Sequence, residues 1–129
     1  MSIFTKIVSG EIPSYKVAED ENHLAFLDIN PNTKGHTLVI PKKEDNKLFD
    51  LDKEAYTILM DFSYRVAKAI EKTVSCNRIG MSVIGLEVPH VHVHLIPIND
   101  MEDMRFVKKQ KLSNDEFISL AKEISSNFI

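Results

Sequence analysis

The chain alternates histidine with valine in the stretch His90-Val91-His92-Val93-His94, which continues into the apolar residues Leu95-Ile96-Pro97. In a β-strand, residues two apart lie on the same face. We therefore expect a strand over residues 91–96, with three imidazoles on one side of a sheet and the valines packed into a core on the other. Histidine has no strand propensity that would explain three in alternation, so the pattern indicates a catalytic or ligand-binding site.

Three imidazoles on one face fit two kinds of site. Open catalytic zinc sites take three protein ligands and a water. A neutral imidazole, with an unperturbed pKa near 6.5, is also a nucleophile for an anionic phosphate, whose oxygens its neighbours can hold. The spacing does not separate these two chemistries. Beside the run, however, there is no cluster of cysteines or carboxylates to support a metal.

The rest of the chain predicts an α+β fold, in which about five mostly antiparallel strands pack against one long helix and a C-terminal helix. The long helix, expected over residues 52–74, has apolar residues at three- and four-residue steps. The C-terminal helix begins with a capping-box pattern from Ser113 to Glu116. A short first helix is expected over residues 3–9, and strands over 15–18, 23–27, 36–40, 79–84 and 91–96, with a weaker strand near 104–107.

The length and composition of the chain exclude several classes of protein. The chain has 129 residues, a formal net charge of −3 and 43% hydrophobic residues, which fits one domain spanning residues 1–129. The mild acidity argues against polymeric nucleic acid and against anionic membranes. The single cysteine, Cys76, excludes an intrachain disulfide and reads as an inert thiol. No apolar stretch approaches the ~20 residues of a membrane span, and no signal peptide is visible, so we expect a cytoplasmic protein.

Several blocks besides the histidine run resemble the histidine triad (HIT) superfamily, most closely its Hint-like nucleotide-binding branch. The family pattern His-x-His-x-His is matched at residues 90–94, and similar blocks occur in family order at residues 3–7, 10–13, 26–31 and 35–42. The C-terminal third is less similar. The resemblance implies a single HIT domain and a homodimer joined across a two-fold axis, with the long helix or the C-terminal segment at the contact.

The resemblance also implies roles for four histidines. His92 is expected to attack the α-phosphate of a purine nucleotide and form a nucleotidyl-histidine, from which water releases a nucleoside monophosphate. His90 and His94 are expected to contact the phosphate and stabilise charge. His36 is expected to support them through hydrogen bonds. This hydrolysis of a phosphoramidate or phosphoanhydride bond requires no metal or other cofactor.

Substrate binding is implied for residues near the N-terminus. Asp28 matches the carboxylate that accepts hydrogen bonds from ribose hydroxyls, and an ionised carboxylate is a suitable partner for a diol. The apolar residues expected to enclose the base are Phe4, Ile7, Phe26 and Ile29. From the residues alone, core packing is the better explanation of these four. His23, by contrast, is expected to be an exposed polar residue.

One departure from the family bears directly on activity. Family members commonly carry a glutamine and a hydroxyl residue just before the triad, whereas this chain reads Gly85-Leu86-Glu87-Val88-Pro89. The hydroxyl position is therefore Glu87, and the usual Asn-Asn-Gly segment is also absent. Two alternatives to the hydrolase stay open, the first because of this departure and the second because of the histidine run. One is a purine-nucleotide-binding protein with little turnover, and the other is a zinc protein that uses His90, His92 and His94.

Overall fold

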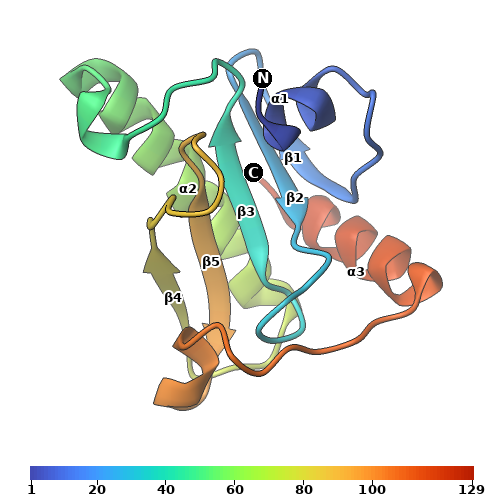
Figure 1. Ribbon diagram of the computed structural model, residues 1–129. Coiled ribbons are helices and arrows are strands. Elements are labelled where there is room, and N and C mark those ends of the chain that lie inside the picture. Colours follow the sequence, from blue (N-terminus) through green and yellow to red (C-terminus); the bar gives the residue numbers. More distant parts are fainter.

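A five-stranded sheet organises the computed structural model, which describes residues 1–129 (Figure 1). The spatial order is β1-β2-β3-β5-β4, and every neighbouring pair is antiparallel. Strand β5 therefore lies inside the sheet, while β4 forms an edge. The bounds are β1 (Lys16–Glu19), β2 (His23–Leu27), β3 (Thr37–Pro41), β4 (Arg78–Ser82) and β5 (Val93–Ile98).

The helices begin where side chains cap their first turns. Helix α2 (Lys53–Thr73) starts after Asp52, whose carboxylate accepts the Ala55 N–H, and α3 (Asn114–Ser126) starts with the predicted capping box between Ser113 and Glu116. A short helix α1 (Ile3–Val8) opens the chain, and η1 (Leu48–Asp50) and η2 (Met101–Met104) are single 3₁₀ turns. None of these helices has the length and apolar character needed to cross a membrane.

The two faces of the sheet carry different cores. Helices α2 and α3 cover one face, where Val93 and Leu95 of β5 join a cluster of 17 buried residues (Figure 1). Helix α1 lies against the other face, where Phe4 and Phe26 belong to a cluster of 6. Because side chains alternate along β5, His94 faces the α1 side. The expected α+β fold is confirmed, and the smaller core leaves room for the histidines.

Two expectations are wrong. His23 is 4% exposed rather than solvated, because it shares the α2 side of β2 with Ala25 and Leu27. There it stacks on Phe62, and its Nδ1 lies 3.0 Å from Asp20. The weak strand expected near residues 104–107 is absent. Asp100 and Asp103 form a capping box that starts η2 instead, and Phe106 has a left-handed φ of 58° that is incompatible with a strand.

Candidate active site

Four imidazoles form a continuous row on the α1 side of the sheet. His36 and His90 are fully buried, and His92 and His94 are 7% and 9% exposed. The ring centroids of His92 and His94 are 5.0 Å apart, and those of His36 and His94 are 5.2 Å apart. Only His94 lies within a strand, because β5 begins at Val93 rather than at the expected Val91. The row nevertheless survives, since the rings of His92 and His94 still lie side by side.

His90 is held at both ring nitrogens. Its Nε2 lies 2.8 Å from the carbonyl oxygen of Pro41, and its Nδ1 lies 2.8 Å from Oγ of Ser2. A carbonyl only accepts, so Nε2 carries the proton and Nδ1 accepts from the serine. Ser2 also caps α1 by accepting the Thr5 N–H. His90 is thus a fixed support, with neither nitrogen free for a ligand.

His92 is oriented by the main-chain carbonyl of His90. Its Nδ1 lies 2.7 Å from the carbonyl oxygen of His90, so Nδ1 carries the proton and donates it. In the neutral ring the lone pair then lies on Nε2. Burial lowers the pKa of His92, although the charges of Asp28 and Glu87 oppose this shift. The ring is therefore neutral near pH 7, with Nε2 as its nucleophilic atom.

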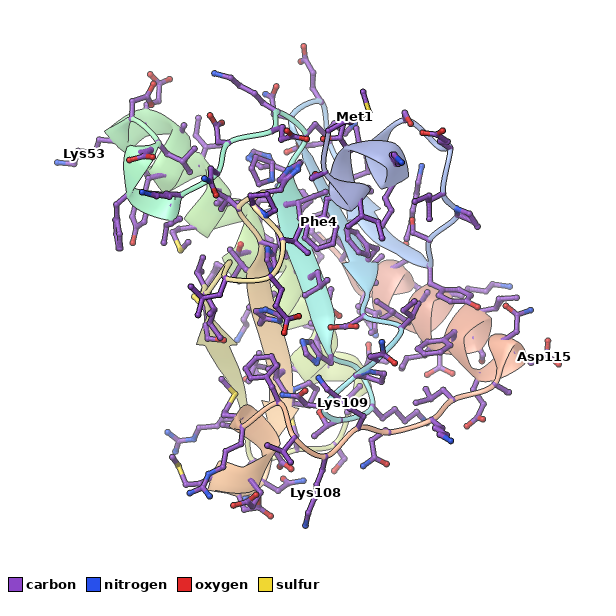
Figure 2. The ribbon with its side chains drawn as sticks, viewed as in Figure 1. Met1, Phe4, Lys53, Lys108, Lys109 and Asp115 are labelled. Atoms are coloured by element: carbon purple, nitrogen blue, oxygen red, sulfur yellow. The ribbon has the colours of Figure 1, made fainter.

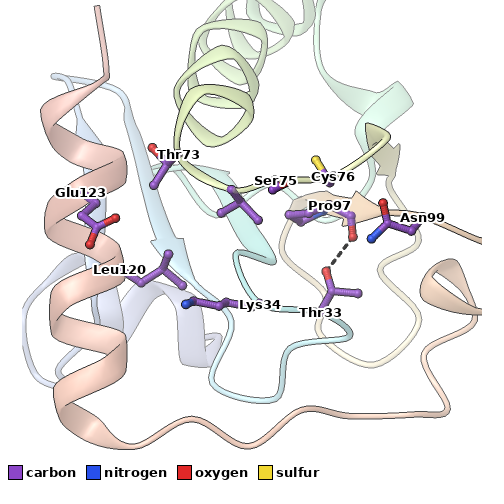
Figure 3. Close-up of a pocket in the computed structure, with 10 residues that line it drawn as sticks. Thr33, Lys34, Thr73, Ser75, Cys76, Pro97, Asn99, Leu120 and Glu123 are labelled. Atoms are coloured by element: carbon purple, nitrogen blue, oxygen red, sulfur yellow. Dashed lines mark hydrogen bonds between the residues drawn. The ribbon is translucent and has the colours of Figure 1, made fainter.

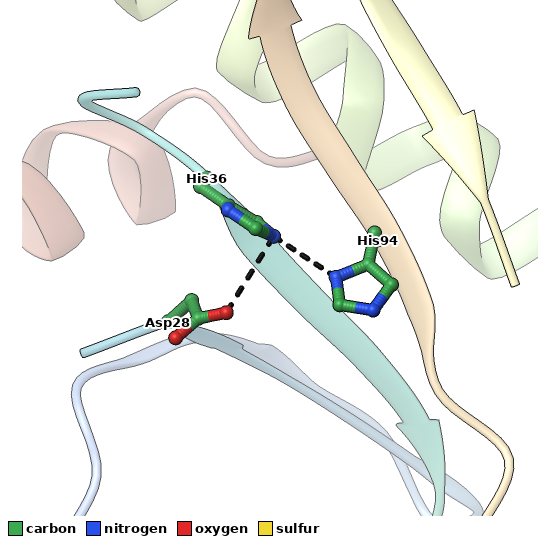
Figure 4. A group of neighbouring side chains, drawn as sticks. All are labelled: Asp28, His36 and His94. Atoms are coloured by element: carbon green, nitrogen blue, oxygen red, sulfur yellow. Dashed lines mark hydrogen bonds and ion pairs between the residues drawn. The ribbon is translucent and has the colours of Figure 1, made fainter. Parts of the chain in front are cut away.

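The tautomers of His36 and His94 follow from one main-chain donor. The N–H of Asn32 donates to Nδ1 of His36 at 3.0 Å, so the neutral ring carries its proton on Nε2. This N–H donates a hydrogen bond to Nδ1 of His94, also at 3.0 Å. The neutral His94 ring therefore carries its own proton on Nε2 (Figure 4). Burial, aided by the neighbouring imidazole and the Lys109 ammonium, lowers the pKa of His36 to about 3 and that of His94 to about 4. His94 therefore presents a neutral N–H donor beside His92.

Asp28 lies beside this pair, at the end of β2. One carboxylate oxygen accepts the Asn30 N–H at 2.8 Å, and the other lies 3.6 Å from Nε2 of His36 (Figure 4). Burial raises the pKa of Asp28. Its side chain keeps 19% of its surface exposed, so it can accept hydrogen bonds from a bound molecule.

The geometry does not favour a metal at these residues. The donor atoms that converge, within 4.8 Å of one another, belong to Asp28, His36 and His94 rather than to the expected His90, His92 and His94. A metal on His36 would need the lone pair of Nε2, yet the Asn32 N–H makes Nδ1 the acceptor and keeps the proton on Nε2. His90, in turn, uses both ring nitrogens on protein partners.

The apolar residues expected to enclose a base divide into two groups. Phe4 and Phe26 contact one another at 5.8 Å between ring centroids, and Phe4 also meets the His92 ring at 4.9 Å. Ile7 belongs to the same buried cluster. Ile29 is 68% exposed in the loop after Asp28. The buried residues form a wall beside His92, and Ile29 is free to contact a ligand.

Four further residues at this site were not predicted from the sequence. The hydroxyl of Ser2 contacts His90, 88 positions away. The main-chain N–H of Asn32 contacts His36, and the ammonium of Lys109 contacts the side chain of Asn32. Phe106, read as part of a strand, packs edge-on against His94 at 4.8 Å. None of these contacts has a periodic or local sequence signature.

A separate hollow of about 320 Å³ lies between the end of α2 and α3 (Figure 3). Its lining includes Lys34, Cys76, Pro97 and Glu123, and no histidine. Burial raises the pKa of the Cys76 thiol, so this cysteine is not an activated nucleophile. This hollow therefore contains neither an imidazole nor an activated thiol.

Known proteins resemble the chain over nearly its whole length. The family model described as HIT domain matches residues 9–101. An uncharacterized HIT-like protein of Methanocaldococcus jannaschii is 40% identical, covering 96% of this chain and 98% of that protein. Adenosine 5′-monophosphoramidase of Saccharomyces cerevisiae is 39% identical, covering 95% of this chain and 79% of that protein. The crystal structure of a Hit-like protein involved in cell-cycle regulation from Bartonella henselae superposes with a TM-score of 0.84 at 32% identity, covering 98% of this chain and 96% of that one.

Proposed function

The chain belongs to the HIT family, and from that premise we propose that it is a hydrolase that cleaves a phosphoramidate or phosphoanhydride bond at the α-phosphate of a purine nucleotide. The observation that carries this proposal is the pair of fixed tautomers in the row. His92 offers a lone pair on Nε2, and His94 beside it offers an N–H. The yeast relative named as an adenosine 5′-monophosphoramidase supports the same reaction class.

The reaction takes place in two displacements. Nε2 of His92 attacks the α-phosphorus, the bond to the leaving nitrogen or oxygen breaks, and a nucleotidyl-histidine forms. The leaving group departs with the bonding electron pair and takes up a proton. Water then attacks the same phosphorus, His92 leaves, and a nucleoside monophosphate is released. The charge that develops on the phosphate oxygens is stabilised by the His94 N–H.

The substrate is held by groups on both sides of the row. We assign the ribose hydroxyls to Asp28, whose exposed carboxylate oxygen accepts hydrogen bonds. We assign the base to the apolar wall, which comprises Phe4, Ile7 and Phe26, with Ile29 closing over it from the loop. His90 positions His92 through its carbonyl, and His36 positions His94 through its Nε2 proton.

The test is turnover by the purified chain and by His92→Asn, a substitution of similar shape that lacks the nucleophilic nitrogen. Adenosine phosphoramidate and a dinucleoside polyphosphate are incubated with each, and release of adenosine monophosphate is followed. We expect the variant to lose turnover by at least about a thousandfold while it still binds adenosine monophosphate and keeps its circular dichroism spectrum. Substantial turnover by the variant would rule out His92 as the nucleophile.

A second candidate function is purine-nucleotide binding with little turnover. Glu87 favours it, because an exposed carboxylate occupies the family's hydroxyl position and places negative charge near His92. The same assay separates the two functions. A protein that binds adenosine monophosphate tightly, yet releases none from either substrate, is a binding protein.

We also propose that the chain forms a homodimer. Strand β4 is an edge of the sheet, with one side unpaired. Met81 within it is 47% exposed and Ile84 just beyond it is 51% exposed, so the edge is apolar as well as open. Light scattering is expected to give twice the chain mass, and a monomer mass would refute the dimer. The cytoplasmic location stays a prediction.

A further inference from the structure

A segment of the C-terminal region passes along the end of the sheet beside the site (Figure 1). Residues 99–110, here called the strap, run from the end of β5 through η2 and past the loop before β3 (Figure 1). Asn32 in that loop is 3% exposed, and its side-chain amide makes two hydrogen bonds to the strap. Its Nδ2 donates to the carbonyl oxygen of Asp103 at 3.0 Å, and its Oδ1 accepts from Nζ of Lys109 at 2.7 Å. The Gln110 N–H adds a bond of 2.8 Å to the carbonyl oxygen of Pro31.

The strap also contacts the histidines through one strained residue. Phe106 has a φ of 58°, a region that bulky side chains rarely adopt. Its ring meets His94 edge-on at 4.8 Å and His36 at 6.1 Å. Nζ of Lys109 lies 5.1 Å from the Phe106 ring centroid, so the same ammonium contacts both the ring and Asn32. The strap therefore encloses the histidine pair between Phe106 and Asn32.

We propose that Lys109 is a positioning residue, which acts through Asn32 to fix the tautomer and orientation of His36 and hence of His94. The sequence of contacts is continuous. Lys109 holds the amide of Asn32, the main-chain N–H of Asn32 holds Nδ1 of His36, and Nε2 of His36 holds Nδ1 of His94. This role deepens the proposed function, because the N–H that His94 presents to the phosphate depends on it.

Charge supports the same role. The groups that face the histidine pair are Asp28, His92 and Lys109. The Lys109 ammonium helps to lower the pKa of both His36 and His94, and so keeps them neutral. Without it, protonation of His94 at Nδ1 becomes easier, and a protonated Nδ1 can no longer accept from His36.

The test compares Lys109→Met with Lys108→Met and Lys109→Arg. Methionine keeps most of the length of lysine and removes its charge and donors. Lys108 is the adjacent lysine of the same strap and, unlike Lys109, makes no hydrogen bond to Asn32 (Figure 2). Arginine at 109 restores both charge and donors. We expect Lys109→Met to lower kcat by about tenfold or more with little change in KM, since a misplacement of about 1 Å can cost about a hundredfold. Lys108→Met is expected to match the unchanged chain, and Lys109→Arg to recover most of the loss.

Nitrogen-15 NMR of the ligand-free protein gives a readout that requires no turnover. In the unchanged chain, His36 is expected to have an unprotonated Nδ1 and a protonated Nε2. In Lys109→Met we expect a mixture of tautomers, and midpoints for protonation of His36 and His94 at higher pH. Identical tautomers and midpoints in both proteins would overturn the proposal. So would a rise in KM with kcat unchanged, which would make Lys109 a substrate contact. If the proposed hydrolase function fails, the NMR result still decides the positioning role.

Discussion

Gly35 precedes His36 directly, and its replacement tests how tightly the site is packed. Gly35 and Gly10 both have positive φ, of 100° and 84°. A Cβ at Gly35 would lie 2.9 Å from Cγ2 of Val74 and 3.1 Å from Cγ of Pro97, whereas one at Gly10 would meet nothing within 4 Å. The left-handed backbone costs an L-residue roughly 1–2 kcal/mol, and overpacking typically adds about 1–3 kcal/mol. We therefore expect Gly35→Ala to lose about 2–5 kcal/mol of stability and Gly10→Ala about 1–2 kcal/mol.

Urea denaturation of the full chain measures both losses. Gly10→Ala is the matched control, because it carries the backbone cost without the overlap. Small domains have about 5–15 kcal/mol of total stability, so the loss at Gly35 is readily resolved. Equal losses in the two variants would refute the reasoning, since they would mean that Val74 and Pro97 move aside without cost.

Two further predictions concern the charges near the row. Glu87→Ser restores a hydroxyl, and we expect it to speed cleavage of adenosine phosphoramidate on the order of tenfold, with Glu87→Gln as the control that removes only the charge. A serine variant slower than the unchanged chain would mean that Glu87 itself takes part. Stability is expected to fall as the pH drops from about 6.5 to about 5.5, because unfolded histidines take up protons while His36 and His94, with pKa values of about 3 and about 4, stay neutral when folded. Linkage gives a loss of about 1 kcal/mol for each, or about 2 kcal/mol together, and equal urea midpoints at the two pH values would contradict it.

Most helices and strands could be predicted from the sequence, because the periodicity and capping residues that specify them lie within each element. The apolar period over residues 52–74 corresponds to α2 at Lys53–Thr73, and the Ser113 capping box begins α3 as expected. The β-branched run before Pro41 became β3 at Thr37–Pro41. Each of these elements is specified by side chains within a few positions of one another, so a single sequence suffices to find it.

The wrong predictions concern residues whose position depends on the folded structure and not on their neighbours in the sequence. His23 read as polar and exposed, yet strand alternation directs it inward, where Phe62 and Asp20 accommodate it. The left-handed Phe106 interrupted a run that looked like a strand. The histidine row itself was predicted. The contact between Lys109 and Asn32 spans 77 positions and has no local signature.

Main-chain atoms decide where three of the four imidazoles carry their protons. The carbonyl of Pro41 sets His90, the carbonyl of His90 sets His92, and the N–H of Asn32 sets His36. Any amino acid can supply a carbonyl, and every amino acid except proline can supply an N–H. An alignment of side chains across relatives would therefore miss these determinants. Among substitutions at position 32, proline alone would remove the main-chain donor while leaving all four histidines in the sequence.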